Sequence, residues 1–401
     1  MSTSYAIIIV LLSVLALCAA ISVAKLFVLI GFELPKRPRG ASSLDGLRGF
    51  LALAVVFHHF VIWLNSYHLN IGWRPPAIHF FNQLGSTGVA IFFMITGYLF
   101  YPVILKGFFE TAWLPLYLKR FFRIIPLVAL SLIVVCLVIG YERSTTLSRN
   151  DLVPLSHWLA AWSQPPLMGY QDSGRVNAYV FWSLKYEWIF YFSILPVCAL
   201  MMSFWSVRYP TWILPGALLL VSLSLSAFSF SGIAFRFFPL FFIGMIAHEC
   251  SIRPSIADKL ASSRVAFGSL LLLLTGMFLF PYAEGTALIF TGQFFIIVAC
   301  GNNLFGALST SSSRLLGEIS FGIYLFHGIV FYIFMKNKNL SFNYLDLDPV
   351  FSLIPLIVLV VVIGILANMF VEKVFIQWGR AVSDLRPLKI SLGFRDKNGQ
   401  L

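Results

Sequence analysis

Long apolar stretches separated by short polar breaks run through most of the chain. Eleven of them lie near residues 5–31, 49–65, 88–105, 124–141, 184–204, 212–229, 233–249, 265–282, 287–305, 319–335 and 350–372. Each has at least about 17 residues, which is enough for a helix to cross the hydrocarbon core of a bilayer. The pattern therefore predicts an all-α fold, a polytopic membrane helix bundle with about 11 transmembrane helices.

Composition supports this prediction and excludes other classes of protein. Of the 401 residues, 59% are hydrophobic and 11% are charged, whereas a soluble globular protein has about 25% charged residues. The 5 cysteines have no paired spacing, so neither a disulfide framework nor a cysteine metal site can be read from them. We attribute the net charge of +12 to membrane topology rather than to nucleic-acid binding, because cytoplasmic loops carry an excess of Lys and Arg.

The distribution of Lys and Arg predicts the orientation of the chain. If the segment after the first helix is cytoplasmic, 19 of the 28 basic residues fall on that side and 8 fall on the other. This asymmetry predicts an N-terminus outside and a cytoplasmic C-terminus. The longest loop, 142–183, is then on the outer side, where it is either a cover for an acceptor site or a plain connection.

The first candidate cluster of functional residues lies at 44–60. Asp45 is placed to cap the start of the helix. Arg48 lies at the predicted cytoplasmic end, and His59 follows eleven residues later on the same helix face, about 16 Å deeper. The pair suits a long anionic ligand with its charged head at the surface. A histidine bonded between helices and a snorkelling arginine would give the same pattern. His58 is expected to point elsewhere.

The second cluster consists of Arg120 and Arg123. Residues three apart are neighbours on a helix face, and both lie at the predicted cytoplasmic boundary. Guanidinium groups bind phosphate with two hydrogen bonds. The alternative is ordinary attraction of juxtamembrane basic residues to anionic lipid.

The third cluster is centred on Glu187, about one turn inside the predicted outer end of its helix and among aromatic residues. An ionisable group inside a membrane is a candidate for function by default. Glu187 could bind sugar hydroxyls, assist proton transfer, or pair with Lys185 or Arg236.

The fourth cluster contains His327, about 12 Å into the helix 319–335. This depth is comparable with that of His59, so the two histidines are candidates for a common cavity. Because neither has a carboxylate or thiolate at ligand spacing, we expect no metal.

These clusters together resemble the acyltransferase 3 family of integral-membrane acyltransferases, in the order of that family's motifs along 42–372. Arg48 and His59 match an Arg or Lys followed by ten residues and a His, within a stretch like L-D-G-L-R. The segment 88–99 resembles G-V-x-x-F-F-x-x-S-G-[FY]-L, with Thr96 in place of the usual Ser, and 120–126 resembles R-x-x-R-I-x-P. The segment 182–191 resembles W-S-L-x-x-E-x-x-F-Y, with Glu187 as the first acid of a common pair and Trp188 in place of the second. The segment 236–244 resembles R-F-x-P-x-F-x-x-G, and 320–327 resembles S-[YF]-x-x-Y-L-x-H.

The resemblance implies three regions and an activity. Residues 1–41 would form an extra N-terminal transmembrane helix and a basic cytoplasmic linker, 42–372 the acyltransferase 3-like membrane domain, and 373–401 a basic cytoplasmic tail too short to bury a core. The implied enzyme is an acyltransferase for groups other than aminoacyl, located in the bacterial inner membrane. It would move an acyl group, usually acetyl, from cytoplasmic acyl-CoA to a hydroxyl of a cell-surface or exported carbohydrate or glycolipid.

The resemblance also implies roles for individual residues. Arg48, Arg120 and Arg123 would hold the phosphates of CoA. His59 would act either as general base on the acceptor hydroxyl or as a transient acyl carrier, and Glu187, nearer the outer face, would orient the acceptor or aid proton movement. Further candidates for the same cavity are Asp45, Thr96, Trp182, Ser183, Arg236, Tyr324 and His327.

Two other classes compete with the enzyme. A transporter or flippase of lipid-linked sugars would also need many helices and buried charges, but the chain has no internal repeat of the kind common in transporters. A structural or assembly subunit would leave the shared face of Arg48 and His59 unexplained. Binding or hydrolysis of acyl-CoA would separate the enzyme from both alternatives.

Overall fold

The computed structural model describes residues 3–34, 41–206, 208–336 and 348–384. Most of these residues are helical. The α-helices are α1 (Thr3–Leu29), α2 (Ala41–Tyr67), α3 (His79–Lys106), α4 (Trp113–Arg143), α5 (Leu152–Leu159), α6 (Trp182–Ile189), α7 (Leu195–Ser203), α8 (Ile213–Ser224), α9 (Phe238–Ser251), α10 (Pro254–Leu260), α11 (Ser263–Leu279), α12 (Ala287–Ala299), α13 (Ser311–Glu318), α14 (Ser320–Lys336), α15 (Leu353–Ala367) and α16 (Lys373–Asp384). The chain is therefore an all-α protein, as predicted.

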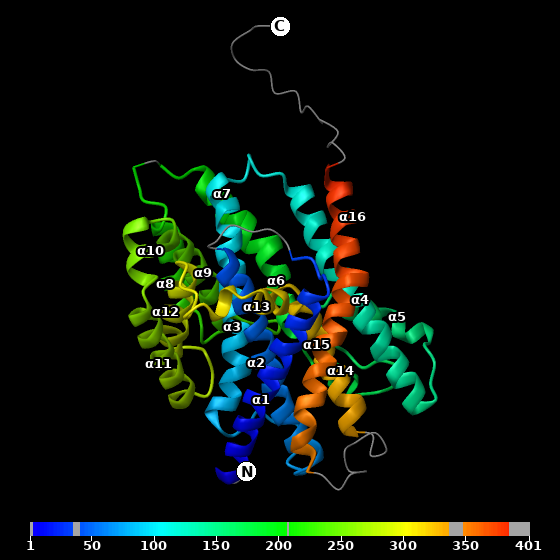
Figure 1. The fold of residues 1–401 in the computed structure, drawn as a ribbon. Coiled ribbons are helices and arrows are strands. Elements are labelled where there is room, and N and C mark those ends of the chain that lie inside the picture. The colour runs from blue at the N-terminus through cyan, green and yellow to red at the C-terminus, as the bar shows by residue number, and fades with distance from the viewer. Residues whose placement is uncertain (1–2, 35–40, 207, 337–347, 385–401) are drawn as a thin grey trace.

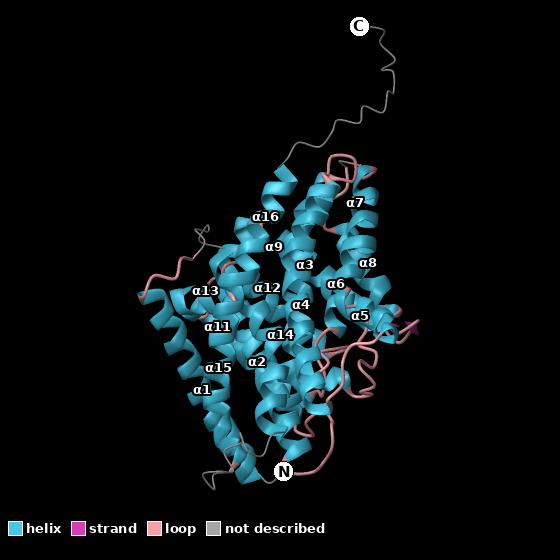
Figure 2. Cartoon of the chain, turned by 90° about the vertical axis from the view of Figure 1, so that its right-hand side faces the viewer, coloured by secondary structure: helices cyan, strands magenta, loops and turns pink. Residues whose placement is uncertain are grey.

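Shorter elements connect these helices. The 3-10 helices are η1 (Arg149–Asp151), η2 (Ser173–Asn177), η4 (Phe235–Phe237), η5 (Ala307–Ser309) and η7 (Pro349–Ser352), and the π-helical turns are η3 (Phe190–Ile194) and η8 (Asn368–Glu372). Within the described residues, the strands are the antiparallel pair β1 (Ser229–Phe230) and β2 (Ile233–Ala234). This pair forms a small hairpin at the side of the bundle (Figure 2).

By length and composition, fewer than eleven helical segments among the described residues qualify as membrane crossings. Six helical segments are long and apolar enough to cross a bilayer, and eight are if each of two bent helix pairs counts as one span. The remaining predicted spans coincide with three shorter apolar helices, α8, α11 and α12. Each predicted apolar stretch is thus helical, but the count of eleven spans is not established.

The first helix packs into the bundle beside α15. At one end, the Tyr5 hydroxyl donates to Asp348 Oδ1 at 2.9 Å. Beyond the other end of α1, Lys373 Nζ donates to the Glu33 carbonyl oxygen at 3.2 Å and lies over the Phe32 ring. The two helices therefore run parallel. α1 begins at the lower end of the bundle in Figure 1, and α16 ends at the upper end.

The predicted helix 319–335 is preceded by a second, shorter helix that bends away from it. α13 and α14 meet at an angle of 66°, and α13 crosses the middle of the bundle in Figure 1. A Cβ atom on Gly317 would lie 1.7 Å from the Asp45 carbonyl oxygen, and one on Gly49 would lie 2.6 Å from Leu316 Cβ. Glycine at these positions lets α13 approach the backbone of α2, which fixes the start of α14 beside Arg48.

The long loop 142–183 is folded and anchored. The Asp151 carboxylate accepts hydrogen bonds from the Ser148 N–H and hydroxyl and from the Met168 N–H, at 2.7–2.9 Å. These bonds lower the pKa of Asp151. η2 packs on α14, where a Cβ atom on Gly328 would lie 2.4 Å from the Asn177 carbonyl carbon.

The basic linker and much of the predicted tail lie outside the described residues. This applies to Lys36, Arg37 and Arg39 in the linker, and to 385–401 in the tail. Within the tail, α16 packs along α4, where a Cβ atom on Gly379 would lie 2.7 Å from Phe122 Cβ.

Candidate active site

Two pockets share a wall in the centre of the bundle. The arginine pocket contains about 660 Å³ of empty space and is lined by Arg48, Val89, Phe92, Phe93, Arg120, Arg123, Ile124, Ser183, Leu184, Glu187, Tyr191, Ser320, Phe321 and Tyr324. The histidine pocket contains about 1240 Å³ and is lined by Val55, His58, His59, Pro75, Asn82, Gly85, Ser86, Val89, Ala90, Trp182, Lys185, Tyr186, Gly232, Ala234, Arg236, Phe237, Leu240, Tyr282, Ala283, Glu284 and Tyr324. Val89 and Tyr324 line both.

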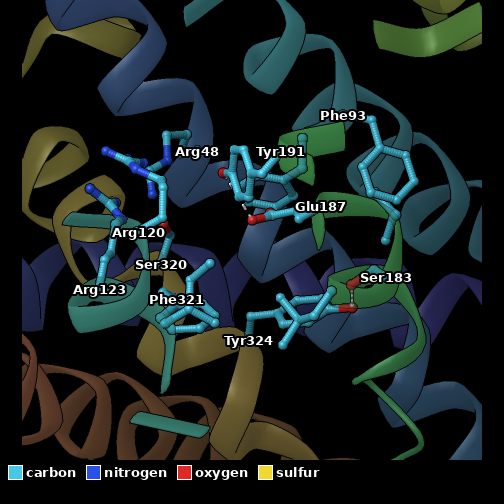
Figure 3. A pocket seen from close by; sticks show the side chains of 14 residues that line it. Arg48, Phe93, Arg120, Arg123, Ser183, Glu187, Tyr191, Ser320, Phe321 and Tyr324 are labelled. Atoms are coloured by element: carbon cyan, nitrogen blue, oxygen red, sulfur yellow. Dashed lines mark hydrogen bonds between the residues drawn. The ribbon is translucent and has the colours of Figure 1, made fainter. Parts of the chain in front are cut away.

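The arginine pocket gathers three guanidinium groups from two helices. Arg48 comes from α2, and Arg120 and Arg123 come from α4. Figure 3 shows the three side chains grouped on one side of the pocket. All are at most partly exposed. Three guanidinium groups in one pocket are suited to a multiply charged anion such as a polyphosphate.

Glu187 faces these arginines. Its carboxylate accepts a hydrogen bond from the Tyr191 hydroxyl at 3.3 Å (Figure 3). It also interacts electrostatically with Arg120 and Arg123. The alternative partners do not bond to it, because Lys185 Nζ donates to the Gly232 carbonyl oxygen at 2.7 Å and Arg236 forms an ion pair elsewhere. Glu187 therefore offsets part of the positive charge of the three arginines in this pocket.

A hydrogen-bonded pair separates the two pockets. The Tyr324 hydroxyl lies 2.8 Å from Ser183 Oγ and donates to the Val180 carbonyl oxygen at 2.9 Å. Tyr324 comes from α14 and Ser183 from α6, so the partition joins the helix of His327 to the helix of Glu187. Movement of the Tyr324 ring would change the wall that the two pockets share.

The two predicted mid-membrane histidines contact each other. His327 Nε2 lies 3.1 Å from His59 Nδ1, although the residues are 268 positions apart in the sequence. His327 Nδ1 lies 3.2 Å from the Ile323 carbonyl oxygen, and His59 Nδ1 lies 3.0 Å from the Val55 carbonyl oxygen. His327 is completely buried, whereas His59 is partly exposed and lines the histidine pocket.

These contacts assign the tautomers of the pair. A carbonyl oxygen accepts only, so in the neutral pair both Nδ1 atoms carry a proton and His327 Nε2 accepts from His59. His59 Nε2 then keeps a free lone pair. This arrangement leaves His59 able to take a proton, with His327 holding its ring in place.

The histidine pocket has aromatic walls and a charged rim. The rings of Trp182 and Tyr186 pack against Phe237, with centroids 5.2 and 4.9 Å apart. At the rim, Arg236 Nε lies 3.1 Å from Glu284 Oε2. Burial raises the pKa of Glu284, and the charge of Arg236 opposes this rise. Aromatic faces beside charged and amide groups are suited to a polar organic molecule.

Two predictions from the sequence are wrong in detail. Asp45 does not cap the helix start, because α2 begins four residues earlier, at Ala41. His58 does not point elsewhere: it lines the histidine pocket, and its Nδ1 lies 3.0 Å from the Phe81 carbonyl oxygen. Of the long loop 142–183, Trp182 lines the histidine pocket, whose rim comes mainly from 232–237 and 282–284.

The remaining candidate residues from the sequence lie in one of the two pockets or in neither. Trp182 and Arg236 line the histidine pocket, and Ser183 lines the arginine pocket. Thr96 lines neither, since it is buried in α3 with its hydroxyl bonded to the Phe92 carbonyl oxygen. Among the described residues, no group of three or more His, Cys, Asp or Glu is arranged to hold a metal ion.

Tyr191 and Glu284 line the pockets but were not predicted from the sequence. Tyr191 follows Glu187 by four residues, so the spacing that places both on one helix face could have identified it. Glu284 is an isolated acid between two apolar stretches. Its partner Arg236 lies 48 residues away in a different connection, so local spacing carries no signal for the pair.

Comparison with known proteins gives the family. The model of the acyltransferase 3 family, described as an acyltransferase domain, matches residues 42–369. A protein of Staphylococcus aureus (strain COL), provisionally named an O-acetyltransferase, is 27% identical over 163 residues, which are 39% of this chain and 24% of that protein.

The peptidoglycan O-acetyltransferase OatA of Listeria monocytogenes (strain EGD-e) is 29% identical over 125 residues, which are 30% of this chain and 17% of that protein. The chain thus spans about a quarter or less of the length of these relatives. No solved structure matches it. The match over most of its length shows that this chain is an integral membrane protein of the acyltransferase 3 family.

Proposed function

We propose that the protein transfers an acetyl group from cytoplasmic acetyl-CoA to a hydroxyl of a cell-surface or exported carbohydrate. The observation that carries this proposal is the meeting of the arginine pocket and the histidine pocket at Tyr324. One pocket suits a polyphosphate and the other suits a polar organic acceptor. The proposed setting is a bacterial inner membrane, with the N-terminus outside and the C-terminus cytoplasmic.

The arginine pocket suits the donor. Arg48, Arg120 and Arg123 would bind the phosphates of CoA, and Glu187 and Tyr191 would keep the guanidinium groups in position. The acyl end of the donor would reach the wall at Tyr324. CoA supplies the activated thioester, and the residues of the chain bind and orient it.

The histidine pocket suits the acceptor. Trp182 is 39% exposed, so its ring is available to stack on a sugar. Lys185, Arg236 and Glu284 lie nearby to contact hydroxyl or charged groups. The named relatives include a peptidoglycan O-acetyltransferase, which favours a glycan of the cell envelope as acceptor.

His59 is the proposed general base. Its free Nε2 would take the proton of the acceptor hydroxyl as that oxygen attacks the acyl carbon and the thiolate of CoA leaves. His327 would hold the Nδ1–H side of the ring. Because His59 lines the acceptor pocket rather than the donor pocket, the role of base is favoured over that of acyl carrier.

The test uses inside-out vesicles with the purified protein in the membrane and a cell-envelope glycan extract in the lumen, and radiolabelled acetyl-CoA is added to the medium outside. The natural protein should release free CoA and transfer label to glycan. His59→Ala should reduce both by at least about 100-fold, the usual contribution of a general base. His68→Ala is the matched control, because His68 is exposed beyond the end of α2. Absence of CoA release by the folded natural protein would overturn the proposal in favour of a transporter.

A further inference from the structure

Ser320 places an unpaired hydroxyl in the arginine pocket. The residue is 1% exposed, and its Oγ is buried without a hydrogen-bond partner among the described residues. It nevertheless lines the pocket, together with Arg48 and Arg123. Figure 3 shows it beside these arginines and on their side of Tyr324. A buried hydroxyl without a partner destabilises a protein, so a ligand that bonds to it would be stabilised by this contact.

The fold holds Ser320 at this place. It is the first residue of α14, immediately after the 66° bend from α13. Backbone hydrogen bonds hold the chain on both sides of Ser320. The Ile319 N–H donates to the Leu315 carbonyl oxygen, and the Ile323 N–H donates to the Ile319 carbonyl oxygen. The close approach of Gly317 to Asp45 fixes the bend. The hydroxyl is therefore a fixed point in the pocket wall.

The position of Ser320 at the start of α14 places it between the arginine pocket and the histidine pair, whose His327 is on the same helix. The ring of Phe321 lines the pocket next to it. Along α14, Ser320 lies seven residues before His327, which is about 10 Å of helix rise. Suppose that the donor binds with its phosphates at the arginines and its acyl carbon near the histidine pair. The segment of the donor that joins these two ends would then pass Ser320. In acyl-CoA that segment is the pantetheine arm, which carries two amide groups.

We propose that Ser320 binds the donor by a hydrogen bond from its hydroxyl to an amide group of the pantetheine arm. This inference rests on the proposed function, because it assigns the arginine pocket to acyl-CoA. It adds a contact to the uncharged part of the donor, which the arginines do not recognise. Ser320 thereby selects a donor with an amide-bearing arm over a phosphate compound without one.

The test measures the dissociation constant of CoA with the full chain in detergent, by calorimetry, for the natural protein and Ser320→Ala. The loss of one net hydrogen bond should weaken CoA binding by about two- to tenfold. Binding of 3′-phosphoadenosine 5′-diphosphate, the part of CoA without the arm, should not change. Arg123→Gln should weaken binding of both compounds.

Ser269→Ala is the matched control. Ser269 in α11 also has a buried Oγ without a partner among the described residues, and it lines neither pocket. Its substitution should leave both dissociation constants unchanged. Equal CoA binding by Ser320→Ala and the natural protein, or equal weakening of both compounds, would overturn the role of Ser320. If the natural protein binds neither compound, the proposed function itself fails, which is a separate result.

Discussion

At the level of single residues, the proposed chemistry depends on the contact between His59 and His327. Sequence spacing predicted a similar depth for both rings, but not their contact. That contact depends on how α2 and α14 are rotated against each other, and this rotation is set by packing between residues 268 positions apart. The same dependence on packing explains why the surroundings of Glu187 were not predicted. The sequence predicted Glu187 near the outer end of its helix and apart from the arginines, whereas in the structure it lines the arginine pocket with Arg120 and Arg123.

Substitution of His327 tests whether it orients His59. His327→Phe keeps an aromatic ring but removes one of the two acceptors for His59 Nδ1–H, leaving the Val55 carbonyl oxygen, so we expect the rate of acetyl transfer to fall by about 10- to 100-fold. His327→Gln can supply an amide oxygen near the position of Nε2 and should retain more activity than the Phe variant. The ratio of kcat values, with KM for acetyl-CoA measured in parallel, checks this. Equal activity of the two variants would contradict an orienting hydrogen bond.

At the level of elements, the apolar pattern predicted where helices form but not where they bend or how long they are. All eleven stretches contain helix. The bend between α13 and α14 was not predicted, because contacts with a distant helix hold it in place. The Gly317 backbone touches that of Asp45 in α2, and no local pattern in 311–336 encodes this contact.

Gly317 should be essential for the packing of α13 on α2. In Gly317→Ala, the new methyl group would overlap the Asp45 carbonyl oxygen, so we expect a loss of stability of about 1–3 kcal/mol. Gly268→Ala is the control, because a Cβ atom there meets nothing within 4 Å. Alanine is the better helix former, so the control should be neutral or slightly stabilising. Thermal unfolding in detergent measures both, and similar melting temperatures would refute the packing argument.

Asp151 should stabilise the fold of the loop 142–183 in a pH-dependent way. Its carboxylate accepts three hydrogen bonds, which lower its pKa. A lowered pKa means that the charged form stabilises the folded state above about pH 4 and that this contribution is lost as the pH falls through the folded pKa. Asp151→Asn should therefore lower the melting temperature at pH 7, with a smaller difference from the natural protein at pH 3. A constant difference would contradict the role of the charge.

At the level of the whole molecule, the proposed reaction requires the two pockets to be reached from opposite sides of the membrane. The exposed connection between α3 and α4 contains Glu110, and the exposed hairpin between α8 and α9 contains Ser229. The excess of Lys and Arg predicts the first connection to be cytoplasmic and the second to be external. The hairpin continues into 232–237, which form part of the rim of the histidine pocket. External access to this rim would bring the acceptor to His59 from outside the cell.

Cysteine labelling tests this arrangement. In a variant with the 5 native cysteines replaced, Ser229→Cys should react with a membrane-impermeant maleimide in intact spheroplasts. Glu110→Cys should react only after the membrane is permeabilised, and this second treatment shows that its thiol is accessible. Transfer from a cytoplasmic donor to an external acceptor needs both results, because the donor and acceptor pockets would then open towards the compartments that contain their substrates. The reverse labelling pattern would place the histidine pocket on the cytoplasmic side and exclude an external acceptor.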